Sequence, residues 1–116
     1  MIIYAIIPAR SGSKGLADKN IKQIGGKPLL AHSIEFAIKL NVDRVFCSTD
    51  SAIYAEIAKK YGAEVPFLRS TEASSSNAME QDILKDLYDS FEKENIPQPD
   101  ILVWLRPTFV FRNFND

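Results

Sequence analysis

Apolar residues along this chain form short continuous runs that alternate with stripes of helical spacing. Residues 2–7 make one unbroken apolar run, which is typical of a strand covered on both faces of a sheet. Residues 44–49 and 101–105 predict two further strands of this kind. Residues 65–68 predict a short strand nearer the edge of the sheet, because Pro66 cannot donate a ladder hydrogen bond.

Three helices are expected between these strands. Pro28 suits the first position of one helix, and Asp50 or Ser51 can cap the next, which Gly62 is placed to end. Asn77, with a glutamate three residues later, predicts a capping box for the third. The apolar positions expected to face the core are Leu30, Ile34, Ala37 and Ile38 in the first helix, Ile53, Ile57 and Tyr61 in the second, and Ile83, Leu84, Leu87, Tyr88 and Phe91 in the third.

The alternation of strands and helices predicts the fold class. It indicates an α/β fold with a mainly parallel sheet between helices, in a single domain over residues 1–116. Ligands of such sheets bind beyond the carboxyl ends of the strands. The segments expected to matter most are therefore 8–20, 48–51 and 106 onward, which each follow a strand.

Composition narrows the classes of partner. The net charge of −1 gives no overall field that would recruit nucleic acid or an anionic membrane. Cys47 is the single cysteine, which excludes an intrachain disulfide and a cysteine-based zinc site. No apolar run approaches the ~20 residues that span a bilayer, and the first residues lack the pattern of a signal peptide. We expect a cytoplasmic protein.

The segment after the first strand has the composition of a phosphate-binding loop. Its glycines allow a sharp turn whose backbone N–H groups can bind an anion, and its hydroxyls and cations add donors. These residues are Arg10, Ser11, Gly12, Ser13, Lys14, Gly15 and Lys19, with Asp18 as the one local acid. A solvent-exposed turn with scattered lysines is the alternative. The sequence lacks the G-x-x-x-x-G-K-[ST] and G-x-G-x-x-G phosphate motifs.

Residues 7–15 (IPARSGSKG), followed by Lys19 and Asn20, resemble the signature of acylneuraminate cytidylyltransferases, also called CMP-sialic acid synthetases. Further segments resemble the family in the same order: 25–29 (GGKPL), 45–50 (VFCSTD), 61–65 (YGAEV), 66–69 (PFLR) and 105–108 (LRPT). The related enzymes that activate KDO usually lack the Ser-Lys-Gly and Lys-Asn pattern and are a weaker match. The resemblance implies a three-layer, Rossmann-like nucleotide-diphospho-sugar transferase fold.

The resemblance also implies a reaction. The family transfers CMP from CTP to the anomeric hydroxyl of a nine-carbon α-keto acid sugar, releases pyrophosphate and uses a divalent cation, usually Mg²⁺. By position, catalytic roles on the triphosphate are implied for Arg10, Lys14 and Lys19. Binding roles are implied for Ser11, Gly12, Ser13, Gly15, Asn20 and Arg106, and contacts with cytosine for Arg69 and for Ser75 or Ser76.

The chain departs from the family pattern in places that concern the sugar. Arg106 stands where the family often has glutamine and could pair with a sugar carboxylate, and residues 109–112 also differ. Family members continue well beyond this length, and their later half supplies the metal-binding aspartates and most of the dimer contact. We therefore expect the N-terminal, nucleotide-binding half. A CTP-binding remnant without turnover, a nucleotidyltransferase for another acidic sugar, and a homodimer all stay open.

Four other residues are assigned by position. His32 and Trp104 are expected to be structural, and Cys47 is expected in the core. Asp50 could approach a metal or cap a helix.

Overall fold

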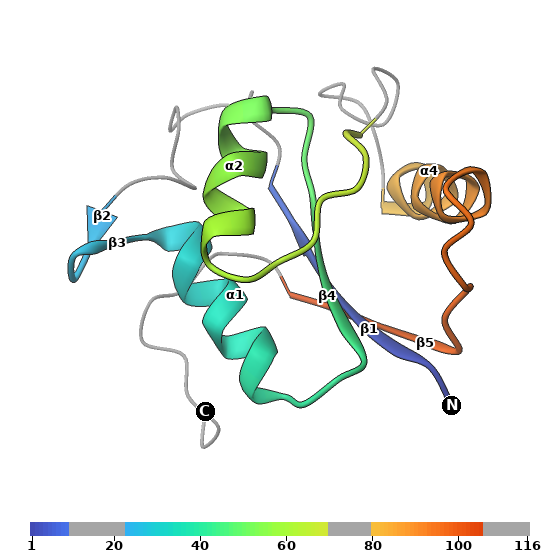
Figure 1. The fold of residues 1–116 in the computed structure, drawn as a ribbon, viewed down its shortest axis with the longest axis horizontal. Helices are drawn as coiled ribbons and strands as arrows, with labels where there is room; N and C mark the ends of the chain where they lie inside the picture. The colour runs from blue at the N-terminus through green and yellow to red at the C-terminus, as the bar shows by residue number, and fades with distance from the viewer. Residues whose placement is uncertain (10–22, 70–79, 106–116) are drawn as a thin grey trace.

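Three parallel strands form the sheet, in the spatial order β4-β1-β5 (Figure 1). They span Ile3–Pro8 (β1), Arg44–Ser48 (β4) and Ile101–Trp104 (β5). This computed structural model describes residues 1–9, 23–69 and 80–105. Each strand lies within one or two residues of its predicted bounds, and the predicted parallel α/β sheet is confirmed.

Helices cover both faces of the sheet. Helices α1 (Leu29–Lys39) and α2 (Ala52–Lys60) pack on one face, and α4 (Glu80–Lys93) lies on the other (Figure 1). The chain therefore leaves β1 over one face to reach β4 and returns over the opposite face to β5. The three-layer arrangement is confirmed. No helix within the described ranges is long and apolar enough to cross a bilayer.

Alternation along β1 explains the two cores. Ala5 and Ile7 point to the side of α1 and α2, whereas Tyr4 and Ile6 point to the side of α4. All four side chains are essentially buried, because β1 is the central strand and both of its faces are covered. The prediction that the apolar run in residues 2–7 is a strand covered on both faces is therefore confirmed.

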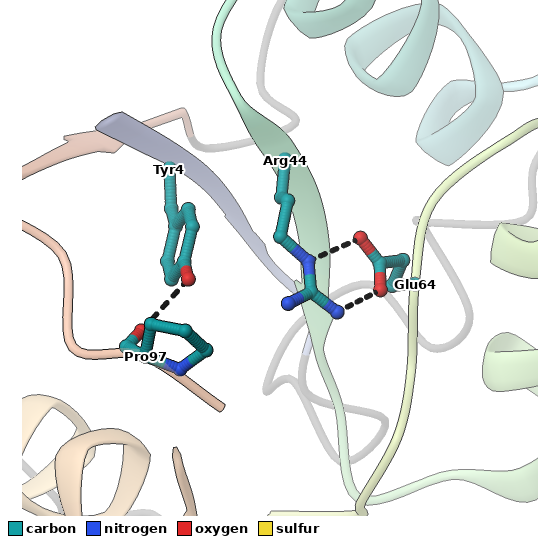
Figure 2. A network of polar contacts seen from close by, with 4 residues as sticks. All are labelled: Tyr4, Arg44, Glu64 and Pro97. Carbon is teal, nitrogen blue, oxygen red and sulfur yellow. Dashed lines mark hydrogen bonds and ion pairs between the residues drawn. The ribbon is translucent and has the colours of Figure 1, made fainter. Parts of the chain in front are cut away.

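The amino end of the sheet is held by polar contacts that Figure 2 shows. The Tyr4 hydroxyl donates to the Pro97 carbonyl oxygen at 2.7 Å. Arg44, at the start of β4, donates to both carboxylate oxygens of Glu64, and its guanidinium lies 5.1 Å from the centre of the Phe46 ring. These hydrogen bonds raise the pKa of Arg44 further above its usual value. The contacts join the loop before β5 and the segment after α2 to the sheet.

The second helix buries only part of the face predicted. Ile57 and Tyr61 are partly buried against the core, as predicted, whereas Ile53 is 68% exposed. The fully buried residues are Tyr54, Ala55 and Ala58, so the buried stripe is centred about one residue, or roughly 100°, from the predicted one. The predicted ends are confirmed: the Ser51 hydroxyl caps α2 by accepting from the Tyr54 N–H at 3.2 Å, and Gly62 follows it with φ +107°.

The predicted strand at 65–68 is wrong. The chain beside β4 makes a single bridge, between Glu64 and Phe46, with bonds from the Glu64 N–H to the Val45 oxygen and from the Cys47 N–H to the Glu64 oxygen. Pro66 has no N–H with which to extend this pairing, so the ladder stops.

A short hairpin precedes α1. Strands β2 (Gln23–Ile24) and β3 (Lys27–Pro28) are antiparallel, and Gly25 and Gly26 between them have φ of +60° and +84°. A two-residue hairpin turn with positive φ at both positions is the kind that glycines permit. Pro28 has an extended ψ of 149° and is the residue directly before α1. The helix therefore begins at Leu29, one residue later than predicted.

Candidate functional site

The carboxyl ends of β1 and β4 meet at one edge of the sheet. Pro8 pairs with Ser48 in the parallel register, and the Ala9 N–H donates to the Ser48 carbonyl oxygen at 2.9 Å. The chain leaves β1 over one face to reach β4 and arrives at β5 over the other face, so the direction of the connections reverses beside β1, and open α/β sheets form their ligand crevice at the carboxyl end of such a reversal. Of the segments that the sequence predicts to matter most, 8–20, 48–51 and 106 onward, the described residues 8–9 and 48–51 lie at this edge.

Three polar residues at this edge are buried: Ser48, Thr49 and Arg69. Arg69 is only 7% exposed, and Ser48 accepts two bonds from its guanidinium. The Arg69 Nε donates to Ser48 Oγ at 3.1 Å, and Nη2 donates to the Ser48 carbonyl oxygen at 2.7 Å. Hydrogen bonds with a charged partner are the stronger kind, and they offset part of the cost of burying the cation.

The backbone of Arg69 is fixed as well. Its N–H donates to the Thr49 carbonyl oxygen at 2.7 Å, directly beyond the end of β4. The Thr49 Oγ1 in turn accepts from the Ser51 N–H at 3.2 Å, and Ser51 caps α2. The strand end, the helix start and the segment that carries Arg69 are thus joined in one hydrogen-bonded cluster, which places a permanent positive charge at the edge where ligands are expected.

Cys47 lies one residue before this cluster and is not a candidate nucleophile. Burial raises the pKa of its thiol to about 12, and the nearby charge of Arg69 opposes this only in part. The side chain is 3% exposed among the apolar residues that face α1 and α2. A protonated, inaccessible thiol is inert, and the prediction that Cys47 belongs to the core is confirmed.

A second ion pair fixes the hairpin that leads into α1. Lys27 Nζ lies 2.8 Å from Glu35 Oε1 and 3.0 Å from Oε2, which ties β3 to the helix. Both side chains are more than a third exposed, so this pair contributes to stability only modestly. It nevertheless ties the hairpin, which is the first described element after residues 10–22, to α1.

Only Arg69 among the residues with predicted site roles lies in the described part of the chain. Its predicted contact with cytosine stays a prediction, as do the roles of the residues outside the described ranges: Arg10, Ser11, Gly12, Ser13, Lys14, Gly15, Lys19, Asn20, Ser75, Ser76 and Arg106. The sequence placed Ser48 in the segment 48–51, which was expected to matter because it follows a strand, but it assigned Ser48 no role of its own.

The described residues contain no ready-made metal-binding cluster. Within residues 1–9, 23–69 and 80–105, no three histidine, cysteine, aspartate or glutamate side chains lie close enough together to hold a metal ion by themselves. Asp50 follows β4 at the candidate edge, and because Mg²⁺ at nucleotide sites is held by one or two carboxylates together with phosphate oxygens and water, a metal role for Asp50 stays a prediction. The helix cap that was the alternative for Asp50 is made by Ser51.

Half-buried Trp104 packs against the cluster of Tyr4, Ile6 and Phe46 on the α4 side, which confirms it as a core residue. His32 lies half-buried on α1, and its structural role stays a prediction.

The family model described as "Cytidylyltransferase" matches residues 4–95 of this chain. The CMP-N,N'-diacetyllegionaminic acid synthase of Legionella pneumophila is 39% identical over 113 residues, which are 97% of this chain and 48% of that protein. An N-acylneuraminate cytidylyltransferase of Streptococcus agalactiae is 46% identical over 90 residues, which are 75% of this chain and 22% of that protein. The chain thus spans less than half the length of these relatives.

Similarity extends to relatives named for other acidic sugars. The pseudaminic acid cytidylyltransferase of Campylobacter jejuni is 38% identical over 91 residues, which are 78% of this chain and 39% of that protein. A solved structure of a CMP:2-keto-3-deoxy-manno-octonic acid synthetase complexed with CTP superposes with a TM-score of 0.75, at 23% identity, over 97% of this chain and 43% of that one. This likeness shows the shared fold.

Proposed function

Because this chain belongs to the cytidylyltransferase family, we propose that it forms the nucleotide-binding part of an enzyme that transfers CMP from CTP to a sialic-acid-type, nine-carbon α-keto acid sugar. The observation that carries the proposal is the family match over residues 4–95, which includes the edge formed by β1, β4 and Arg69. Relatives named for sialic, legionaminic and pseudaminic acids support an acidic sugar as the acceptor.

In the proposed reaction the anomeric hydroxyl of the sugar attacks the α-phosphorus of CTP. The new P–O bond forms as the bond to pyrophosphate breaks, the hydroxyl proton is lost to solvent, and negative charge moves to the leaving group. Arg10, Lys14 and Lys19 would stabilise that charge, since cations aimed at developing charge lower the barrier to nucleotidyl transfer. Ser11, Gly12, Ser13, Gly15 and Asn20 would position the nucleotide. A magnesium ion, when bound, would help to neutralise the phosphates, and Asp50 is the described carboxylate at the edge that could hold it.

The proposed base site lies on the outer side of β4. Arg69 would meet the cytosine together with Ser75 or Ser76, because a guanidinium supplies donors for the acceptor atoms of the base. The burial of Arg69 at the carboxyl edge supports this assignment, since its bonds to Ser48 hold a positive charge at a fixed place on the edge where ligands of such sheets bind.

A second candidate concerns the acceptor sugar. The 39% identity to the legionaminic acid synthase extends over 97% of this chain, and Arg106 replaces the usual glutamine. A nucleotidyltransferase for a different acidic sugar is therefore the alternative, with Arg106 pairing with the sugar carboxylate.

The test is pyrophosphate release by the purified chain with CTP and a panel of acidic sugars, together with calorimetric titration of CTP. Release with N-acetylneuraminate supports the proposal, and release only with another sugar of the panel supports the alternative. Measurable CTP binding without turnover would identify a nucleotide-binding unit that is inactive by itself. If CTP does not bind, the proposed function is wrong for this chain.

A further inference from the structure

We propose that Ser48 is a positioning residue that orients the guanidinium of Arg69 toward the base of the nucleotide and thereby sets the preference for cytosine. The inference rests on the proposed function, because it presumes that a cytidine nucleotide binds at the carboxyl edge of the sheet. It goes beyond that function in assigning a role to a strand residue that carries no charge and was given no part in binding the nucleotide.

The two bonds to Ser48 fix both the place and the plane of the guanidinium. Nε and Nη2 lie on the same edge of the planar group, and Ser48 accepts from both, with its hydroxyl at 3.1 Å and its carbonyl oxygen at 2.7 Å. A single bond would leave the group free to rotate, whereas two bonds to one residue define its plane. The remaining N–H groups of the five-donor fork therefore point away from Ser48.

Ser48 is itself held rigidly. Its carbonyl oxygen also accepts from the Ala9 N–H at 2.9 Å, so the same atom joins the end of β1 to Arg69. Ser48 is 6% exposed and Arg69 is 7% exposed, which excludes most competing water. An arginine side chain loses much conformational freedom when it is ordered, and the bonds to Ser48 restrict that freedom independently of any contact with a ligand. Pre-ordering of this kind increases the selectivity of a binding group.

The chemistry of the bases explains why orientation would matter. Cytosine presents two adjacent acceptors, O2 and N3, whereas uracil carries a hydrogen on N3. A guanidinium edge held in the plane of the base can donate to both cytosine atoms but meets the N3 hydrogen of uracil. A loosely held guanidinium would bind the uracil oxygen alone and discriminate poorly.

The phosphate groups are a less suitable target for Arg69. The cationic segment that follows β1 is the proposed triphosphate site, whereas Arg69 comes from the segment that runs along the outer side of β4 and is bonded to Thr49. A nucleotide that spans the edge from β1 to β4 would therefore place its base, rather than its phosphates, nearer to Arg69.

The experiment compares CTP and UTP binding by calorimetry in the full chain and in Ser48→Ala, with Ser48→Thr as the variant that keeps the hydroxyl. In Ser48→Ala the Kd for CTP should rise about fivefold and the Kd for UTP by less than about twofold, so that the preference for CTP falls. Ser48→Thr should restore the preference. Ser33→Ala is the matched control, because it removes the hydroxyl of another buried serine, which lies within α1 and outside the hydrogen-bonded cluster of Arg69.

A double-mutant cycle separates positioning from general loosening. In an Arg69→Ala background, the change Ser48→Ala should cause no further loss of CTP preference, because its effect acts through the guanidinium. Equal losses in both backgrounds, or an unchanged CTP-to-UTP ratio in Ser48→Ala, would overturn the inference while leaving CTP binding and the proposed function intact. Failure of the unaltered chain to bind CTP would overturn both.

Discussion

Arg44 and Glu64 form a two-bond ion pair that joins the start of β4 to the segment following α2 (Figure 2). The pair lies at the amino end of the sheet, opposite the edge that carries Arg69. Its position helps to explain how a segment that is not a strand stays against the sheet: the backbone bridge and this ion pair hold its beginning, and the bonds of Arg69 to Ser48 and Thr49 hold its end.

Glu64→Gln should therefore lower stability without affecting nucleotide binding. Both side chains are about a third or more exposed, so the pair is partly screened, and we expect a loss of about 0.5–1 kcal/mol. Chemical denaturation measures the loss. The exchanged pair Arg44→Glu with Glu64→Arg should recover part of it. A fall in CTP affinity in Glu64→Gln would contradict the assignment of the site to the opposite edge.

The segment around Glu64 also illustrates what the sequence could not supply. Its apolar residues have the composition of a strand, but strand formation depends on a ladder, and Pro66 removes the donor that the next pairing needs. Similarly, Ile53 fits a helical stripe by spacing, whereas the packing of Ala55 and Ala58 in the core cluster shared with α1 decides which face is buried. Local pattern identifies the elements, and tertiary contact decides their faces and edges.

The candidate site was likewise predictable from the sequence only in part. The position of the edge followed from the order of strands and helices, because parallel strands end together. The pairing of Arg69 with Ser48 could not be predicted in this way, because 21 residues separate them in sequence and only the fold brings the two together.

Gly62 should be intolerant of any side chain. Its φ is +107°, and a Cβ there would lie 3.0 Å from Ile38 Cδ1. Gly62→Ala is expected to reduce stability by about 1–3 kcal/mol, measured by chemical denaturation. Gly25→Asn is the matched comparison, because Gly25 has φ +60° with open space around it and asparagine is accepted in such turns. Similar losses in the two variants would refute the explanation by conformation and crowding.

Cys47 should make stability fall at high pH. Burial raises the pKa of the folded thiol from 9.0 to about 12, so above pH 9 the unfolded chain releases a proton that the folded chain retains. The unfolded state is then favoured, and stability decreases by about 1.4 kcal/mol per pH unit between those two values. Denaturation curves at several pH values should show this slope in the natural sequence relative to Cys47→Ala. Parallel pH dependences in the two proteins would be inconsistent with a buried, protonated thiol.

Lys14→Ala directly tests whether Lys14 binds the triphosphate of CTP. The side chain would lose a hydrogen bond to a charged phosphate, so CTP affinity should fall by about 1–3 kcal/mol in a calorimetric titration. Lys39→Ala is the control for charge alone, because Lys39 is an exposed lysine in the last turn of α1, where the chain turns toward the start of β4. Both variants change the net charge by the same amount, so a general electrostatic effect would weaken CTP binding equally in the two. A selective loss in Lys14→Ala would support a triphosphate site in the segment after β1, whereas unchanged affinity would remove Lys14 from that site.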